Sequence, residues 1–232
     1  PRATHLRAQV IQSRARLLMR RAITKNAVIL GLFATGPAAT LAITNEATLD
    51  QVRCNKQQAL MTSLNQVMPH DQHDNDLLTD RITVSDPLLG RNEHHLYRAR
   101  LNGEDNGAVL EATAPDGYGG AIALIVGVDT AGEIQGVRVV PPHHENPGLG
   151  DSIETKKSDW ILGFNGHSLG NPATSGWAVK KDGGDFDSFT GATITPRAVV
   201  GAVHRALQYF DANQNKLFSA PADTTPVETC DE

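Results

Sequence analysis

Residues 120–140 read GAIALIVGVDTAGEIQGVRVV, and this stretch decides the fold class. Its first part, residues 120–128, is almost entirely apolar, as in a strand buried on both faces. Its second part, residues 133–140, alternates between apolar and polar side chains, as in a strand with one face toward solvent. The turn between them ends in Gly132, which supplies the positive φ that a hairpin needs. The sequence therefore predicts an antiparallel hairpin within an α+β domain that contains an antiparallel sheet.

Helical spacing of apolar side chains marks two further segments. Residues 45–68 carry such a pattern and are followed directly by Pro69. Val199, Val203 and Leu207 fall on one face of a helix expected over residues 196–210. The other expected elements are strands at 91–99 and 176–181, a helix at 151–164, loops at 69–80 and 165–176, and an extended tail from residue 217.

Charge is distributed unevenly along the chain. The first 45 residues contain seven Lys or Arg and no acid, whereas residues 46–232 contain 14 basic and 26 acidic residues, a formal charge of −12. A basic arm is typical of nucleic-acid contact, of contact with anionic lipid, or of a membrane-topology signal. The uncharged run NAVILGLFATGPAATLAIT at residues 26–44 follows the arm. As a helix it extends about 28 Å, close to the roughly 30 Å hydrocarbon core of a bilayer.

We therefore expect one transmembrane helix in a bacterial inner membrane, in contact with lipid, and no nucleic-acid partner. The positive-inside rule places the N-terminus in the cytoplasm and the acidic body in the periplasm. The pair Gly36-Pro37 is tolerated in membrane helices. The alternative is a cleaved signal peptide, with an apolar part at 27–34 and a small-residue exit at 37–39, although the basic region before it is unusually long.

These patterns divide the chain into five segments. They are a cytoplasmic basic arm at 1–25, a transmembrane helix at 26–44, a membrane-proximal helix and loop at 45–90, a periplasmic domain at 91–215 and an extended tail at 216–232. Cys54 and Cys230 are too few to form a zinc or iron–sulfur site. An oxidising compartment permits a disulfide between them, and two free thiols are the alternative.

A second informative stretch is DSFTGATITPR at residues 187–197. Thr195 is expected as the N-cap of the following helix and Pro196 as its first residue, where no N–H donor is needed. The unpaired N–H groups and the positive dipole end of such a helix attract an anion. The hydroxyl of Thr193, two residues before the expected cap, is placed where it can carry a phosphate ester.

The run Asp-x-x-Thr-Gly-Ala-Thr at residues 187–193 resembles the flavinylation motif of the FMN-binding domain family, in which FMN is joined through its phosphate to the last threonine. The longer run at residues 177–200 resembles the RnfG/RsxG members of that family, from the Rnf/Rsx electron-transport complexes, in particular. A second loop, HHENPGLG at residues 143–150, resembles the His-x-Glu-Thr-Pro-Gly-Leu-Gly loop of the family, with Asn146 in the usual Thr position.

The resemblance implies covalent FMN on Thr193. Leu149 is expected to offer an apolar surface to the flavin ring, Trp177 to flank it, and Lys180 to balance phosphate charge. The full set of expected cofactor-binding residues is Thr193, Thr190, Gly191, Ala192, Asp187, Glu145, Gly148, Leu149, Gly150, Trp177 and Lys180.

The same resemblance implies an electron carrier within a membrane complex that exchanges electrons between ferredoxin and NAD(H) and couples them to ion movement. Its partners are then the other subunits and, during maturation, a flavin transferase that uses FAD as donor. No catalytic residue and no substrate site are expected in this chain. The alternatives are the related FMN-carrying subunit of the sodium-pumping NADH:quinone oxidoreductase, a membrane-anchored flavin redox sensor, and a structural stalk that never receives flavin.

Other ligand sites are not predicted. No P-loop and no dinucleotide-binding glycine motif occurs in the sequence. Neighbouring His143 and His144 point in different directions in an extended segment, so they are not expected to chelate one metal ion. The acidic residues Asp182, Asp185 and Asp187 in a glycine-rich loop are typical of solvated side chains, and a divalent ion held there during flavin transfer is the alternative.

Overall fold

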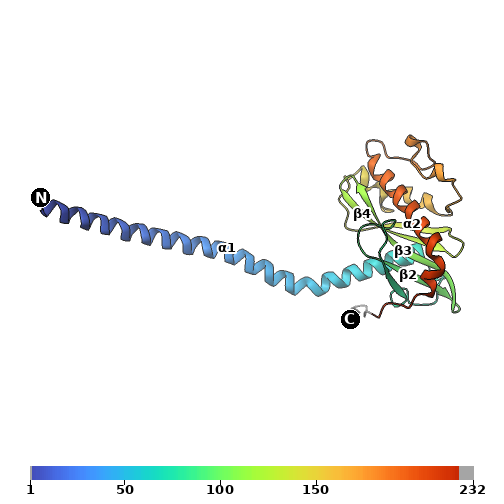
Figure 1. The fold of residues 1–232 in the computed structure, drawn as a ribbon, viewed down its shortest axis with the longest axis horizontal. Coiled ribbons are helices and arrows are strands. Elements are labelled where there is room, and N and C mark those ends of the chain that lie inside the picture. Colours follow the sequence, from blue (N-terminus) through green and yellow to red (C-terminus); the bar gives the residue numbers. More distant parts are fainter. Residues whose placement is uncertain (1, 225–232) are drawn as a thin grey trace. The chain divides into compact units, whose positions relative to one another are not determined.

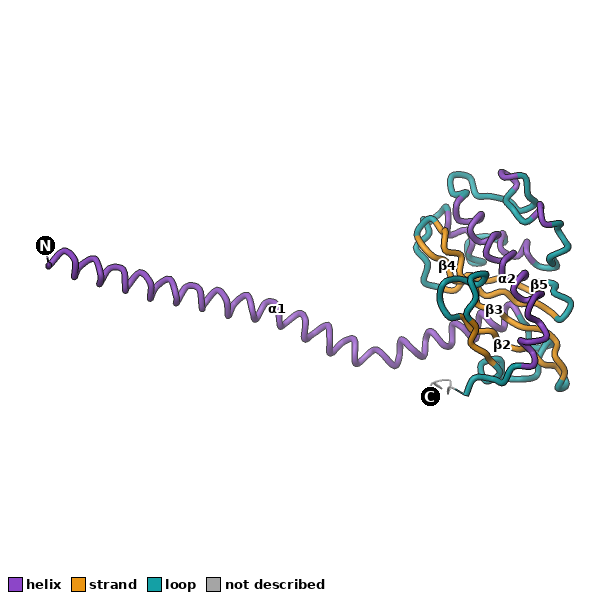
Figure 2. The backbone as a smooth tube through the Cα atoms, in the orientation of Figure 1, coloured by secondary structure: helices purple, strands orange, loops and turns teal. Residues whose placement is uncertain are grey.

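The computed structural model describes the backbone of residues 2–224 and the side chains of residues 19–21 and 23–224. The chain divides into two compact units, residues 1–55 and residues 56–232. The first unit is helical. The second contains an antiparallel sheet, a long helix and a region of short helical turns (Figures 1 and 2).

Helix α1 runs without interruption over Arg2–Val67 (Figure 1). The two helices predicted at residues 26–44 and 45–68 are confirmed as helical, but they form one element. The Met19–Val67 part contains a stretch long and apolar enough to cross a membrane, and none of that stretch is buried in protein. Phe33, for example, is 74% exposed. An apolar helix face without a protein partner is suited to lipid.

Five strands form one antiparallel sheet in the sequential order β1-β2-β3-β4-β5. Their bounds are β1 Arg81–Val84, β2 His94–Leu101, β3 Glu104–Gly117, β4 Gly120–Asp129 and β5 Ile134–Val140. The predicted hairpin is confirmed as β4 and β5, with Val126 opposite Val137 and with Gly132 at φ 80° in the turn. The strand predicted at 91–99 corresponds to β2, whereas β1 and β3 were not predicted.

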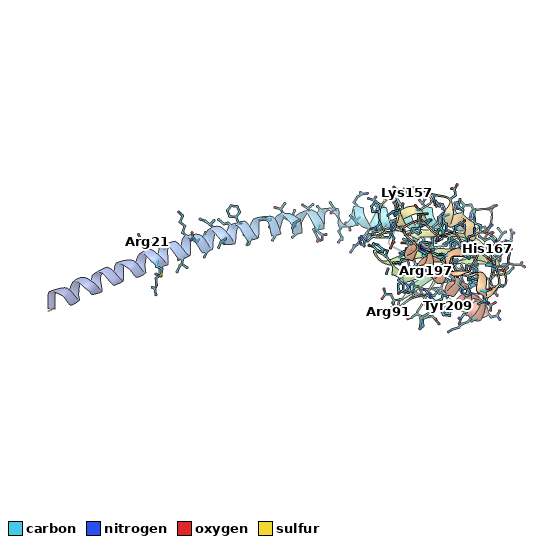
Figure 3. All side chains as sticks on the ribbon, turned by 90° about the horizontal axis from the view of Figure 1, so that it is seen from above. Arg21, Arg91, Lys157, His167, Arg197 and Tyr209 are labelled. Carbon is cyan, nitrogen blue, oxygen red and sulfur yellow. The ribbon has the colours of Figure 1, made fainter. Side chains whose placement is uncertain are left out.

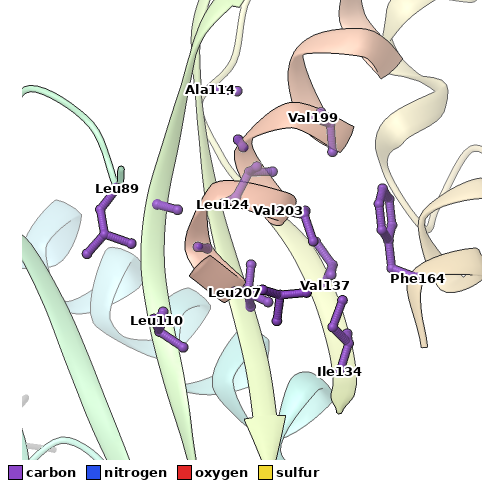
Figure 4. Packing of buried hydrophobic residues seen from close by; sticks show 14 of the residues in the cluster. Leu89, Leu110, Ala114, Leu124, Ile134, Val137, Phe164, Val199, Val203 and Leu207 are labelled. Atoms are coloured by element: carbon purple, nitrogen blue, oxygen red, sulfur yellow. The ribbon is translucent and has the colours of Figure 1, made fainter. Parts of the chain in front are cut away.

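Each face of the sheet is covered by a helix. Helix α2, Ile194–Ser219, lies along one face, and Val199, Val203 and Leu207 project from it toward the strands (Figure 4). The end of α1 covers the other face, where Leu64 joins a second buried cluster. Successive residues of a strand point to opposite faces. In β4, Leu124 belongs to the cluster under α2 and Ile125 to the cluster under α1, so this strand is buried on both sides as predicted.

A cross-strand glycine pair lets α1 approach the sheet closely. Gly127 and Gly136 lie opposite each other in β4 and β5. A Cβ atom added to Gly136 would lie 3.0 Å from the Cα of Val67, and one added to Gly127 would meet the Val67 carbonyl. A side chain at position 127 would collide with the Val67 backbone, and one at position 136 would force Val67 to shift; Val67 is fully buried at this contact.

The segment between β5 and α2 differs from the prediction. The helix predicted at 151–164 is wrong. Two short 3-10 helices, Gly150–Ile153 and Trp160–Phe164, occupy that range. Between them the hydroxyl of Ser158 donates to the Ser152 carbonyl at 2.7 Å and accepts from the Trp160 N–H at 3.2 Å, so side-chain bonds replace helical ones.

The strand predicted at 176–181 is also wrong. The chain there forms 3-10 turns at Thr174–Gly176 and Lys180–Asp182, and only Val179 makes a bridge, to Phe186. The helix expected at 196–210 is confirmed but longer, because α2 continues to Ser219; the expected tail therefore begins later.

Of the two cysteines, only Cys54 lies in the part of the chain that the structure describes. Cys54 is disulfide-bonded in the structure. Cys230 lies outside the described residues, so the pairing of the two stays a prediction.

Candidate functional site

The Thr-Gly-Ala-Thr segment forms a tight turn that leads directly into α2. Phe189 and Ala192 close the turn as an antiparallel bridge, and the Ala192 N–H donates to the Phe189 carbonyl at 3.2 Å. Gly191 has φ 82° at the third turn position, where a type II turn requires a residue that tolerates positive φ. Thr190 and Gly191 are exposed at the tip of the turn.

Helix α2 begins two residues earlier than the sequence suggests. Its first residue is Ile194, and its N-cap is Thr193, not Thr195. The predicted capping by Thr195 is wrong because its hydroxyl donates to the carboxylate of Glu145 instead. Pro196 is accordingly the third helical residue, not the first.

Thr193 itself is half-buried, and its side chain makes no capping hydrogen bond. Its carbonyl accepts from the Arg197 N–H at 3.3 Å, which closes the first helical turn. Pro196 has no N–H, and the N–H groups of Ile194 and Thr195 precede the first residue that has an intrahelical acceptor. The Thr193 hydroxyl therefore lies beside backbone donors at the positive end of a helix of 26 residues.

The loop at residues 143–150 lies against the same helix start. A Cβ atom added to Gly150 would lie 3.0 Å from the Thr195 hydroxyl, and one added to Gly191 would lie 3.8 Å from Leu149 Cδ2. The loop and the turn, about 40 residues apart in the sequence, are therefore neighbours. Leu149 is 43% exposed and Ile194 45% exposed, so two apolar side chains face outward next to Thr193.

Glu145 joins the loop to both α2 and the sheet. Its side chain is 5% exposed. One carboxylate oxygen accepts from the Thr195 hydroxyl, and the other accepts from the Gly119 N–H at 2.9 Å, next to β4. A buried carboxylate is stable only when its oxygens are hydrogen-bonded. Glu145 therefore holds the loop in place through two bonds. Gly148, at φ 75°, is exposed on the same loop.

The charged residues around the turn are paired with each other. Lys180 Nζ lies 2.7 Å from Asp187 Oδ1. Arg197 bonds both carboxylate oxygens of Asp182, at 2.6 and 2.7 Å, and holds the pKa of that carboxyl below its usual range. Within the described residues, no group of three or more His, Cys, Asp or Glu side chains is arranged to hold a metal ion. The divalent-ion alternative for the Asp182 loop has no support from this geometry.

The two tryptophans occupy different surroundings. Trp160, which the sequence did not connect with the motif, donates from its indole N–H to the Asp187 carbonyl at 2.8 Å, and its ring contacts Phe189 edge-on with centroids 5.1 Å apart. Trp177 is 6% exposed in the core and stacks on His204, with centroids 5.2 Å apart and an interplanar angle of 6°. Trp160 thus supports the turn, and no local sequence signal indicates it, because 27 residues separate it from Asp187.

Comparison with known proteins adds the family. The FMN-binding domain model matches residues 117–208, and the RnfG N-terminal region model matches residues 19–67. The G subunit of an ion-translocating oxidoreductase complex from Shewanella loihica is 48% identical over 207 residues, which is 88% of this chain and 97% of the relative. The chain belongs to this RnfG family. A Pseudomonas aeruginosa member is 48% identical over 86% of this chain and 94% of its own, and one from Salmonella typhi is 45% identical over 92% and 100%.

Membership in the RnfG family assigns a role to each of the two units. The apolar helix corresponds to the family's N-terminal region and anchors the chain to a membrane. The sheet from the end of its third strand onward, together with α2, belongs to the FMN-binding domain, which includes the 145–150 loop and the Thr193 turn. The protein is an electron-carrier subunit of a multi-subunit ion-translocating oxidoreductase, the Rnf complex.

Proposed function

We propose that FMN is attached through its phosphate to the Thr193 hydroxyl, and that this flavin is the group through which the subunit passes electrons. When bound, the flavin supplies reversible electron uptake and release. The chain itself supplies attachment, orientation and charge balance. The observation that carries the proposal is the placement of Thr193: a half-buried hydroxyl without a capping bond, at the N-terminus of a long helix.

The residues around Thr193 fit a flavin phosphate. The first N–H groups of α2 and its positive dipole end stabilise a phosphate ester at this position. The outward-facing side chains of Leu149 and Ile194 offer apolar surface for a flat ring. Lys180 and Arg197 already form ion pairs with Asp187 and Asp182. The negative charge of the phosphate is therefore balanced mainly by the N-terminus of α2.

The exposed turn also supports a proposal about maturation. We infer that a flavin transferase brings FAD to the exposed turn. The Thr193 oxygen then forms the ester bond to the FMN phosphorus, the FAD pyrophosphate bond breaks, and AMP leaves while the hydroxyl proton passes to water. Thr190 and Gly191 at the exposed tip leave the turn accessible to such an enzyme.

We further propose that the anchor lies in the inner membrane, in contact with lipid, with the basic arm in the cytoplasm and the FMN-binding domain in the periplasm. The seven cations before the apolar run support this orientation. Covalent attachment suits a carrier in that compartment, because a dissociable cofactor would be lost from it.

The test compares Thr193 with an exposed threonine outside the motif. Thr193→Val removes the acceptor hydroxyl, whereas Thr155→Val removes a surface hydroxyl of the same kind. We expect covalent flavin, measured by fluorescence on a denaturing gel and by intact mass, to be lost only in Thr193→Val, with the circular dichroism of both variants unchanged. Covalent flavin that persists in Thr193→Val would overturn the proposal.

A further inference from the structure

A pocket of about 400 Å³ lies apart from the Thr193 site. The loop between β1 and β2, strand β3 and helix α2 form its walls. The lining residues are Ser85, Asp86, Pro87, Gly90, Arg91, Thr113, Pro115 and Arg205. Figure 3 shows Arg91 on the outside of the domain. None of the lining residues belongs to the 143–150 loop or to the Thr193 turn, so the pocket has no part in the proposed flavin attachment.

Two arginines of this pocket are unpaired in the part of the chain that the structure describes. Of the seven arginines in residues 56–232, four bond other side chains: Arg98, Arg100, Arg138 and Arg197. The side chains of Arg81, Arg91 and Arg205 make no hydrogen bond or ion pair within the described residues, and the last two line the same pocket. Residues 46–232 carry an excess of acidic residues. Two guanidinium groups without partners in one pocket of this domain are therefore complementary in charge to an acidic group of another molecule.

The walls of the pocket are fixed by hydrogen bonds. The Asp86 carbonyl accepts from the Leu89 N–H at 3.0 Å, and the Leu89 carbonyl accepts from the Thr113 N–H at 2.7 Å. The Thr113 hydroxyl is 2.9 Å from Nε2 of buried His94. Leu89 thus attaches the loop, which its own turn bond to Asp86 closes, to strand β3. A preformed pocket costs less conformational entropy on binding than a flexible one.

Charge selects the kind of ligand. Asp86 also lines the pocket, and one of its oxygens accepts from the Leu88 N–H at 2.8 Å. The two guanidinium groups and the Asp86 carboxylate together give the pocket a net charge of one positive unit. One carboxylate of a ligand neutralises that charge, whereas a phosphate dianion would leave the pocket with a net negative charge. The rings of Pro87 and Pro115 provide apolar surface for the stem of such a group. A volume of about 400 Å³ holds a side chain and its neighbours.

We propose that this pocket receives a carboxylate side chain, Asp or Glu, from another subunit of the same complex, and so fixes the FMN-binding domain within the assembly. Guanidinium groups bind carboxylates through paired N–H donors, which gives orientation as well as attraction. The inference rests on membership of the complex and is independent of the linkage to Thr193.

The first experiment uses the purified complex. Arg91→Gln and Arg205→Gln are combined, and the matched control combines Lys156→Gln and Lys181→Gln, two exposed cations that make no ion pair in the described part of the chain. The fraction of this protein that stays with the complex is measured as salt concentration rises. At a salt concentration that leaves the wild-type protein bound, we expect the fraction of this protein that stays with the complex to fall at least about tenfold in the arginine variant. The same fraction should be unchanged in the lysine control.

Both variants are also analysed for covalent flavin by intact mass. Flavin should be present in each, so a failure of docking and a failure of the proposed function give different results. Equal retention of the arginine variant and the lysine control at every salt concentration would overturn the docking proposal.

The second experiment identifies the ligand directly. Arg205→Lys keeps the charge and introduces an amine that a carbodiimide couples to a carboxylate in contact with it. We expect an amide cross-link between position 205 and an Asp or Glu of another subunit, identified by peptide mass spectrometry. A cross-link to Asp86 of the same chain, with none to another subunit, would contradict the proposal.

Discussion

Glu145 illustrates how one residue serves both fold and site. Its buried carboxylate accepts from Thr195 at the start of α2 and from the Gly119 N–H beside β4. Glu145→Ala leaves both donors without an acceptor, so we expect the free energy of unfolding to fall by about 2–4 kcal/mol. Glu145→Gln, which keeps one good acceptor oxygen, should lose less. Urea denaturation followed by tryptophan fluorescence measures the effect, and exposed Glu133→Ala serves as the control.

An unchanged stability of Glu145→Ala would contradict this prediction. If Glu145→Ala unfolds at the same urea concentration as Glu133→Ala, the buried bonds to Thr195 and Gly119 contribute no net stability. The 145–150 loop would then be held by other contacts, and its position against Thr193 would need another explanation.

His204 makes the stability of the domain depend on pH. Burial, with a contribution from Arg205, lowers its pKa below the ordinary value of about 6.5. The unfolded chain therefore binds this proton more readily than the folded one. The stability contributed by neutral His204 is present above about pH 6.5 and is lost as the pH falls through the lower folded pKa. We expect His204→Gln to flatten the loss of stability between about pH 7.5 and pH 5, measured by thermal denaturation.

Exposed His144→Gln is the matched control for that experiment and should leave the pH profile unchanged. A His204→Gln variant that still loses stability as steeply as the wild type would assign the effect to another group. Because the ring of His204 stacks on Trp177, tryptophan fluorescence reports on this position during the same titration.

At the scale of elements, regular patterns were predictable from sequence. The hairpin at β4 and β5 was found because apolar and alternating segments flank a glycine turn, and α2 because its buried residues repeat at helical spacing. Strand β3 was missed because it contains Gly107, Pro115 and Asp116, which are uncommon in strands, and because its pairing with β2 and β4 overrides that local preference.

The candidate site was predictable only in part, for a related reason. The Thr193 turn and the 143–150 loop were recognised from short motifs that lie within continuous sequence. Their contact through Glu145 and Thr195, and the support from Trp160, depend on residues 27 to 50 positions apart. The 3-10 turns between β5 and α2 were predicted wrongly because side-chain bonds, such as those of Ser158, replace regular backbone patterns there.

Helix α2 is the element that joins the core to the Thr193 site. Leu207 is 2% exposed, two turns or more from the helix start, and packs in the cluster between helix and sheet (Figure 4). Leu207→Ala leaves a cavity, and we expect the free energy of unfolding to fall by about 2–5 kcal/mol. Exposed Asp211→Ala on the same helix should change it by less than about 0.5 kcal/mol. Equal effects of the two variants in urea denaturation would mean that α2 is not held by this packing.

At the scale of the whole molecule, charge and hydrophobicity divide the chain into parts with different surroundings. The seven cations of residues 1–25 precede the apolar run, and every acidic residue follows it. The basic arm and the apolar run therefore contain no acidic residue, and the domain that is proposed to receive flavin carries the net negative charge. This asymmetry is the basis of the proposed orientation, since Lys and Arg near a membrane span set its direction.

The orientation can be tested by removing the signal. In spheroplasts, a periplasmic domain is open to added protease, so we expect the wild-type domain to be digested. Replacing the seven Lys and Arg of residues 1–25 by Gln removes the bias that keeps the N-terminus inside. A fraction of the molecules should then insert in the opposite direction and keep their domain protected until the membrane is dissolved in detergent. Lys156→Gln, a change of charge in the domain itself, should leave digestion complete. Protection of the wild-type domain in intact spheroplasts would show that the proposed orientation is reversed, and with it the side of the membrane on which Thr193 can receive flavin.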